Sequence, residues 1–135
     1  MSFDSPSHYS GIPTRLFEAI EQVETPAYIT DQTAIVETMK AVDEIKDASG
    51  VKFLYTLKPN AHPDAMVPML GHVDGFAASS VNEAIVARGI LGNQGSVHIT
   101  TPGFREQELC KIGTLCDYAA MNSLSQFEQI GRAHV

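Results

Sequence analysis

The residue of this sequence with the clearest chemical potential is Lys58, which follows the run Val51–Leu57. Five of those seven residues are apolar or aromatic, and Pro59 cannot donate to a β-ladder, so a buried strand is predicted to end here. Desolvation at the end of such a strand disfavours the ammonium form of a lysine. A neutral amine attacks an aldehyde and forms a Schiff base, which makes Lys58 our candidate for covalent chemistry on a carbonyl. The simpler alternative is that the chain leaves the core here and places a charge in water, as most lysines do.

The other side chains capable of chemistry form no recognisable site in the sequence. Cys110 and Cys116 are too few and too closely spaced for a secreted disulfide framework, and we expect both to be packing residues on or near a helix. The histidines show no pair at helical ligand spacing and no cysteine at ligand spacing, so no metal site is expected. His62 follows Lys58 closely, and entry into a helix is its simplest role. The histidines are His8, His62, His72, His98 and His134.

Composition restricts the class of protein. The chain has 135 residues with 44% hydrophobic and 19% charged content, which predicts one modest folded domain rather than a disordered tail. No apolar stretch is long enough to span a bilayer, and the N-terminus lacks the basic and apolar regions of a secretory signal. The net charge is −7 and the basic residues are not clustered, which argues against a nucleic-acid partner. We therefore expect a cytoplasmic protein that binds neither membrane nor nucleic acid.

Apolar periodicity predicts that strands and helices alternate along the chain. Asp31 is a candidate cap for a helix whose apolar residues recur every three or four positions. The segment Ser80–Glu83 has the pattern of a capping box, and Pro63 opens a short helix. Predicted strands cover residues 25–29, 51–57, 73–78, 96–100 and 117–122, and predicted helices cover 32–49, 63–70, 81–90, 105–115 and a segment starting near 125.

This alternation predicts the α/β class, with parallel strands and right-handed crossovers. The sequence contains no glycine-rich dinucleotide fingerprint in a strand-to-helix context, which favours a barrel over a doubly wound sheet. In a (β/α)8 TIM-type barrel the chemistry gathers at the carboxyl ends of the strands. Four segments are then expected at one mouth: Lys58, Ala77–Ser79, Thr100–Thr101 and Asn122–Ser123.

An ordered set of short motifs resembles the amino-terminal barrel half of the alanine-racemase-fold (fold type III) pyridoxal-phosphate decarboxylases. Within that family it is most similar to the carboxynorspermidine (carboxyspermidine) decarboxylase branch. No single motif is long, and the order and spacing of the set carry the resemblance. The motifs are Thr25–Tyr28, Lys58 after an apolar strand, Gly75–Ser80 followed by Glu83, Gly95–Thr100, Cys116–Asp117 and Asn122–Gln126.

The resemblance implies that Lys58 is both the catalytic residue and the residue that binds pyridoxal 5'-phosphate, through a Schiff base. It also implies decarboxylation of carboxynorspermidine or carboxyspermidine to norspermidine or spermidine in polyamine biosynthesis, by a homodimer in its full-length form. Ala77 stands where ornithine and arginine decarboxylases usually have Asp, which argues against simple ornithine decarboxylase activity. Other amino-acid decarboxylases of the ornithine, diaminopimelate or arginine type, a non-catalytic pyridoxal-phosphate carrier of the same barrel, and an unrelated α/β interaction module are the alternatives.

The length predicts a partial barrel, since a complete one needs roughly 250 residues. We expect a leader segment at 1–24, a partial cofactor-binding barrel at 25–129, and a non-native tail at 130–135. The residues Ile130–Val135 can be encoded by the start of a common sequencing adapter, and the apolar helical pattern breaks at Gly131. A natural short C-terminus is the alternative. The later barrel strands and a C-terminal β domain are expected to be missing, which would leave the fragment inactive.

Overall fold

A computed structural model of the chain describes residues 13–133. The chain divides into two units, Met1–Asp31 and Gln32–Val135. In the first unit, α1 spans Thr14–Ile20, and the guanidinium of Arg15 pairs with the carboxylate of Asp31 at 2.7 Å. The prediction of a strand at 25–29 is wrong, because none of these residues pairs with a strand. Pro26 has no N–H to donate and Tyr28 is fully exposed, so this segment lacks both a ladder and a buried face.

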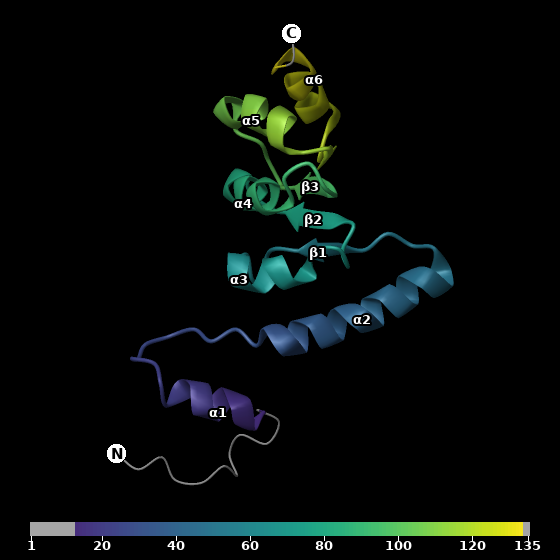
Figure 1. The fold of residues 1–135 in the computed structure, drawn as a ribbon. Coiled ribbons are helices and arrows are strands. Elements are labelled where there is room, and N and C mark those ends of the chain that lie inside the picture. The colour runs from purple at the N-terminus through teal and green to yellow at the C-terminus, as the bar shows by residue number, and fades with distance from the viewer. Residues whose placement is uncertain (1–12, 134–135) are drawn as a thin grey trace. The chain divides into compact units, whose positions relative to one another are not determined.

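The second unit is built on a four-stranded parallel sheet in the order β1-β2-β3-β4 (Figure 1). The sequential order agrees with consecutive βα units and contains no reversal of the kind that marks a doubly wound sheet. The predicted α/β class is therefore confirmed. The elements of this unit are α2 (Gln32–Ser49), β1 (Leu54–Thr56), α3 (Pro63–Met66), η2 (Val67–Met69), β2 (Gly75–Ala78), α4 (Val81–Leu91), β3 (Ser96–Thr100), η3 (Glu106–Glu108), α5 (Leu109–Leu115), β4 (Tyr118–Ala120) and α6 (Leu124–Ala133).

Each predicted helix and strand of this unit is present, and the main differences concern length. The strands predicted at 51–57 and 117–122 shorten to Leu54–Thr56 and Tyr118–Ala120. The last helix continues through Gly131, where the apolar pattern of the sequence breaks, to Ala133. A single glycine costs a helix only about 1 kcal/mol relative to alanine, which is too little to end it. The boundaries expected at residues 25 and 130 stay predictions, and residues 1–12 and 134–135 lie outside the described chain.

The core lies between one face of the sheet and the helices. Phe76 of β2 and Val97 and Ile99 of β3 are at most 1% exposed, and they belong to one cluster with the apolar side of α4. Figure 1 shows α3, α4 and α5 on this side of the sheet. Alternation along each strand places every second residue on the opposite face. The Cα register there aligns Thr56 with Ala77, Ala77 with His98 and His98 with Tyr118.

Candidate functional site

Lys58 lies just beyond the carboxyl end of β1. The amide of Leu57 donates to the carbonyl of Ala77 at 3.0 Å, so the contact with β2 continues one residue past the strand. The side chain of Leu57 is 1% exposed, and Lys58 follows it on the exposed side of the chain. Within the described residues, the ammonium group of Lys58 takes part in no hydrogen bond or ion pair. The desolvation expected for this amine is therefore not supplied by this segment, although its place at the strand end is as predicted.

The turn after Lys58 is held by its own backbone and by two side chains. The amide of His62 donates to Oδ1 of Asn60 at 2.9 Å, and the hydroxyl of Tyr55 donates to the carbonyl of Asn60 at 3.2 Å. Burial raises the pKa of the Tyr55 hydroxyl above its ordinary value. His62 caps α3 by accepting the amide of Asp64 on Nδ1 at 3.3 Å, which confirms the helix-entry role. The connection that leaves the candidate lysine is thus fixed at both ends.

The ends of β2 and β4 carry the same capping arrangement. After β2, Ser80 accepts the amide of Glu83 at 3.2 Å, and the carboxylate of Glu83 accepts the amide of Ser79 at 2.6 Å. The predicted capping box at the start of α4 is thus present in a shifted form, because Glu83 accepts from Ser79 and not from the N-cap residue Ser80. After β4, Ser123 accepts the amide of Gln126 at 3.3 Å, and Oε1 of Gln126 accepts the amide of the preceding Asn122 at 2.7 Å.

The four segments expected at one mouth follow β1, β2, β3 and β4 in turn. Because these strands are parallel and adjacent, their carboxyl ends share one edge of the sheet. We call this edge the carboxyl edge; it carries Lys58, Ala77–Ser79, Thr100–Thr101 and Asn122–Ser123. Among these residues, only the lysine offers a strong nucleophile.

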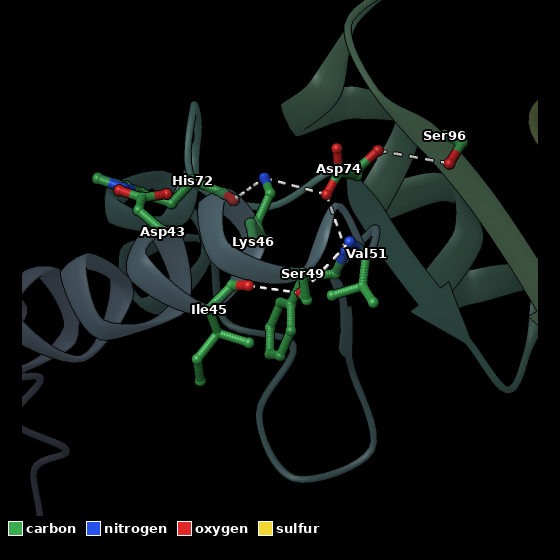
Figure 2. Close-up of polar contacts among 9 residues, drawn as sticks. Asp43, Ile45, Lys46, Ser49, Val51, His72, Asp74 and Ser96 are labelled. Carbon is green, nitrogen blue, oxygen red and sulfur yellow. Dashed lines mark hydrogen bonds and ion pairs between the residues drawn. The ribbon is translucent and has the colours of Figure 1, made fainter.

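The opposite edge of the sheet, which we call the amino edge, is closed by ion pairs. Asp74 precedes β2, and its carboxylate accepts the amide of Phe53 at 2.8 Å and pairs with Nζ of Lys46 at 3.0 Å (Figure 2). Lys46 also donates to the carbonyl of His72 at 2.5 Å. The hydrogen bond from Phe53, with further help from Lys46, holds the pKa of Asp74 below its ordinary value. We call this set of contacts the first clasp.

A second clasp of the same design precedes β4. The carboxylate of Asp117 accepts the amide of Val97 at 2.7 Å and pairs with Arg88 of α4 at 2.5 Å. Arg88 also donates to the carbonyl of Leu115 at 2.9 Å. The hydrogen bond from Val97 lowers the pKa of Asp117, and Arg88 adds to that effect. In both clasps a helix cation binds the carboxylate and the carbonyl two residues before it, so one unit of structure is used twice.

A cavity of about 530 Å³ opens at the amino edge, between Lys52, Asp74, Ser96, His98 and Tyr118 among others. The imidazole of His98 stacks on the ring of Tyr118 with centroids 4.4 Å apart, and its Nε2 lies 3.0 Å from Oγ of Ser96. Lys58 is not among the residues that line this cavity. This cavity is therefore not the place of the candidate chemistry.

The remaining reactive side chains do not form a site. Cys110 is exposed and Cys116 is half-buried, and the two thiols are not joined in a disulfide. The expectation of two buried cysteines is thus wrong for Cys110, which lies on the outer side of α5. Burial raises the pKa of the Cys116 thiol to about 11, which makes it a poor nucleophile. No cluster of three or more potential metal ligands occurs within residues 13–133, and no helix in that range is long and apolar enough to cross a bilayer.

The fold and the site together define a parallel α/β segment that presents a lysine at the carboxyl edge of its sheet. No protein-family model matches the chain. It is similar to the carboxynorspermidine/carboxyspermidine decarboxylase of Herminiimonas arsenicoxydans, with 29% identity over 107 residues, which cover 79% of this chain and 29% of that protein. The corresponding protein of Campylobacter jejuni subsp. jejuni is also 29% identical, over 109 residues that cover 81% of this chain and 28% of its own length.

A solved structure of the same kind of decarboxylase is also similar to this chain. The crystal structure of the Campylobacter jejuni carboxynorspermidine decarboxylase complexed with norspermidine matches with a TM-score of 0.74 and 28% identity, covering 82% of this chain and 30% of that chain. The resemblance drawn from the sequence motifs is confirmed. The chain spans less than a third of the length of each of these relatives.

Sequence reasoning missed the two clasps and the contacts of Gln126. The clasps join residues that are twenty or more positions apart in sequence, so local patterns do not reveal them. Gln126 could have been found, because Ser123-Leu124-Ser125-Gln126 has the spacing of a capping box.

Proposed function

We propose that this chain is the amino-terminal part of a pyridoxal-phosphate-dependent carboxy-lyase, which converts carboxynorspermidine or carboxyspermidine to norspermidine or spermidine. The observation that carries the proposal is the place of Lys58. It stands at the carboxyl edge of a segment that is similar, in sequence and fold, to a decarboxylase solved with norspermidine. The expected cytoplasmic location and homodimeric state belong to the same proposal.

The residues of this segment fit the aldehyde group of pyridoxal phosphate. Lys58 offers an exposed primary amine with no acidic partner among the described residues, and an amine is the group that combines with an aldehyde. When bound, the cofactor supplies a sink for the electrons that remain after the carboxylate leaves. We assign its phosphate and ring-nitrogen contacts to parts of the longer relatives that this segment does not span.

The chain's own contribution to this reaction is orientation. The hydrogen bond from Leu57 to Ala77 fixes the backbone immediately before Lys58, and Asn60 and His62 fix the turn that follows it. An amine on a rigid strand end loses less freedom when it engages a substrate or cofactor than an amine on a free loop. The net charge of −7 is compatible with a polycationic substrate, since it favours the approach of cations.

The test uses a full-length protein that contains this segment, mixed with pyridoxal phosphate and reduced with borohydride. We expect mass spectrometry to find the reduced adduct on Lys58, and we expect Lys58→Ala to lose both the adduct and carbon dioxide release from carboxynorspermidine. Lys52→Ala is the matched control, because Lys52 is also exposed but lies at the amino edge. This variant should keep both.

Two outcomes would change the conclusion in different ways. An adduct on another lysine, or on none, removes the assigned role of Lys58. An adduct on Lys58 without release of carbon dioxide from either carboxylated polyamine favours a carrier protein that binds pyridoxal phosphate without catalysis.

A further inference from the structure

The two capping boxes at the carboxyl edge are closed by different side chains, a glutamate in the first and a glutamine in the second. The amide nitrogen that distinguishes the glutamine has a hydrogen-bond partner of its own. Glu83 in the first box and Gln126 in the second both accept an amide hydrogen with a side-chain oxygen. Gln126 has in addition an amide nitrogen, Nε2, which donates to the carbonyl of Pro102 at 3.1 Å. A glutamate cannot make this second contact, because an ionised carboxylate has no hydrogen to donate. The amide at position 126 therefore does something that capping alone does not require.

The contact joins two neighbouring strand ends. Pro102 belongs to the loop that leaves β3, whereas Gln126 belongs to the first turn of α6, which follows β4. Nδ2 of Asn122 donates to the same carbonyl of Pro102 at 3.3 Å. Within the loop itself, the hydroxyl of Thr101 donates to the carbonyl of Gly103 at 3.2 Å. The side chains of Asn122 and Gln126, which follow β4, thus both donate to one carbonyl oxygen of the loop after β3.

These contacts are exposed, which determines what they can do. Exposed hydrogen bonds compete with water and contribute little to the free energy of unfolding of a whole domain. They do restrict the positions open to a loop whose ends are already fixed by a strand and a helix. Residues 101–103 follow β3 at the same edge as Lys58, where the loops of such a fold contact ligands.

We propose that Gln126 is a positioning residue, which acts through the carbonyl of Pro102 to hold residues 101–103 in place for binding of the amine-bearing substrate. This inference rests on the proposed function. It assigns to Gln126 an effect on substrate binding and none on attachment of the cofactor to Lys58.

The test compares Gln126→Glu and Gln126→Met in a full-length protein that contains this segment. The first variant keeps the oxygen that accepts the amide of Asn122 and loses the donor, and the second loses both. Glu128→Gln is the matched control, because it exchanges the same two side-chain types at an exposed position of the same helix. The measurements are amide hydrogen exchange in residues 101–104, KM and kcat with carboxynorspermidine, and borohydride trapping on Lys58.

In both Gln126 variants we expect exchange in residues 101–104 to become about fivefold faster, as loss of one net hydrogen bond implies. KM should rise about three- to tenfold while kcat changes less than about twofold, which is the signature of lost substrate binding. Trapping on Lys58 should stay at the wild-type level, and Glu128→Gln should match the wild type throughout. The rise of KM in Gln126→Glu is a stringent result, because the added negative charge would by itself attract a cationic substrate.

Unchanged exchange in Gln126→Met, or faster exchange with an unchanged KM, overturns the positioning role and leaves the proposed function in place. A wild-type protein that releases no carbon dioxide from either carboxylated polyamine overturns the proposed function, and the positioning role with it.

Discussion

Replacing Asp117 with alanine tests how the amino edge of the sheet is held together. The substitution removes the acceptor of the Val97 amide and the anionic partner of Arg88. Arg88 keeps the carbonyls of Leu115 and Gly92, so its charge is not left without contacts. The amide of Val97, near the start of β3, loses its acceptor. We expect this loss to account for most of the decrease in the free energy of unfolding.

The size of the effect follows from the exposure of the two side chains. A hydrogen bond to a charged group contributes about 1.5–3 kcal/mol, and a surface ion pair contributes about 0–1 kcal/mol. The side chain of Asp117 is 45% exposed, so solvent screening places both contributions near the lower end. We expect Asp117→Ala to cost about 2 kcal/mol. Asp117→Asn should cost about 1 kcal/mol, because its side-chain oxygen still accepts from Val97.

Hydrogen exchange at the Val97 amide is the direct assay, since it reports local opening at this residue. A loss of about 2 kcal/mol makes exchange roughly thirtyfold faster. Asp47→Asn, an exposed position on α2, should change the free energy by less than about 0.5 kcal/mol and serves as the control. Exchange at Val97 that does not change in Asp117→Ala, or an equal cost for alanine and asparagine, would refute the reasoning.

The pH dependence of the free-energy cost of the Asp117 substitutions is a second test of the same contacts. The pKa values of Asp74 and Asp117 are lowered in the folded chain, first by the hydrogen bonds from Phe53 and Val97. A lowered folded pKa means that the stabilisation is present above the ordinary carboxyl pKa of about 4 and is lost as the pH falls through the folded value. The cost of Asp117→Asn should therefore be full at pH 7 and shrink below about pH 4. A cost that is constant down to pH 2 would mean that the charge of Asp117 does not contribute.

Two further predictions concern the packing of the sheet and the thiols. A Cβ atom at Gly75 would lie 1.9 Å from the carbonyl oxygen of Ser96, so Gly75→Ala should destabilise the chain by about 1–3 kcal/mol or more in urea unfolding. Gly89→Ala is the matched control, since nothing lies within 4 Å of its added methyl and the helix should gain up to about 1 kcal/mol. Cys110 should be alkylated at pH 8 much faster than Cys116, whose pKa of about 11 leaves roughly one thiolate in a thousand, and peptide mapping that finds equal rates would contradict this.

The order and type of the elements were accessible to sequence reasoning wherever apolar periodicity was strong. The strand at Ser96–Thr100 was predicted with the bounds that the structure shows, because glycines end the preceding turn and the strand is buried on alternate residues. The segment 25–29 was predicted as a strand and is not one, because strand propensity does not supply a ladder partner. The apolar periodicity of α2 did not show where its contact with the core ends, because Met39 and Val42 are buried whereas Ile45, three positions further, is 60% exposed.

The candidate site was predicted in part. The position of Lys58 follows from the apolar run and the proline that end β1, and the capping box at Ser80 follows from local spacing. The exposure of Lys58 does not follow from sequence, because burial depends on what covers a strand end. The bond from Gln126 to Pro102 depends on the separation of two loops, which is set by the register of β3 and β4.

The two edges of the sheet treat their lysines in opposite ways, and this difference bears on reactivity. Lys46 at the amino edge lies between the carboxylate of Asp74 and the carbonyl of His72, and both oxygens stabilise an ammonium ion. These two contacts use the amine of Lys46 to join α2 to the segment that precedes β2. Lys58 at the carboxyl edge is exposed and has no such oxygen among the described residues. The lysine at the amino edge therefore helps to hold the sheet together, whereas the lysine at the carboxyl edge is left exposed by this segment, as our proposal for Lys58 requires.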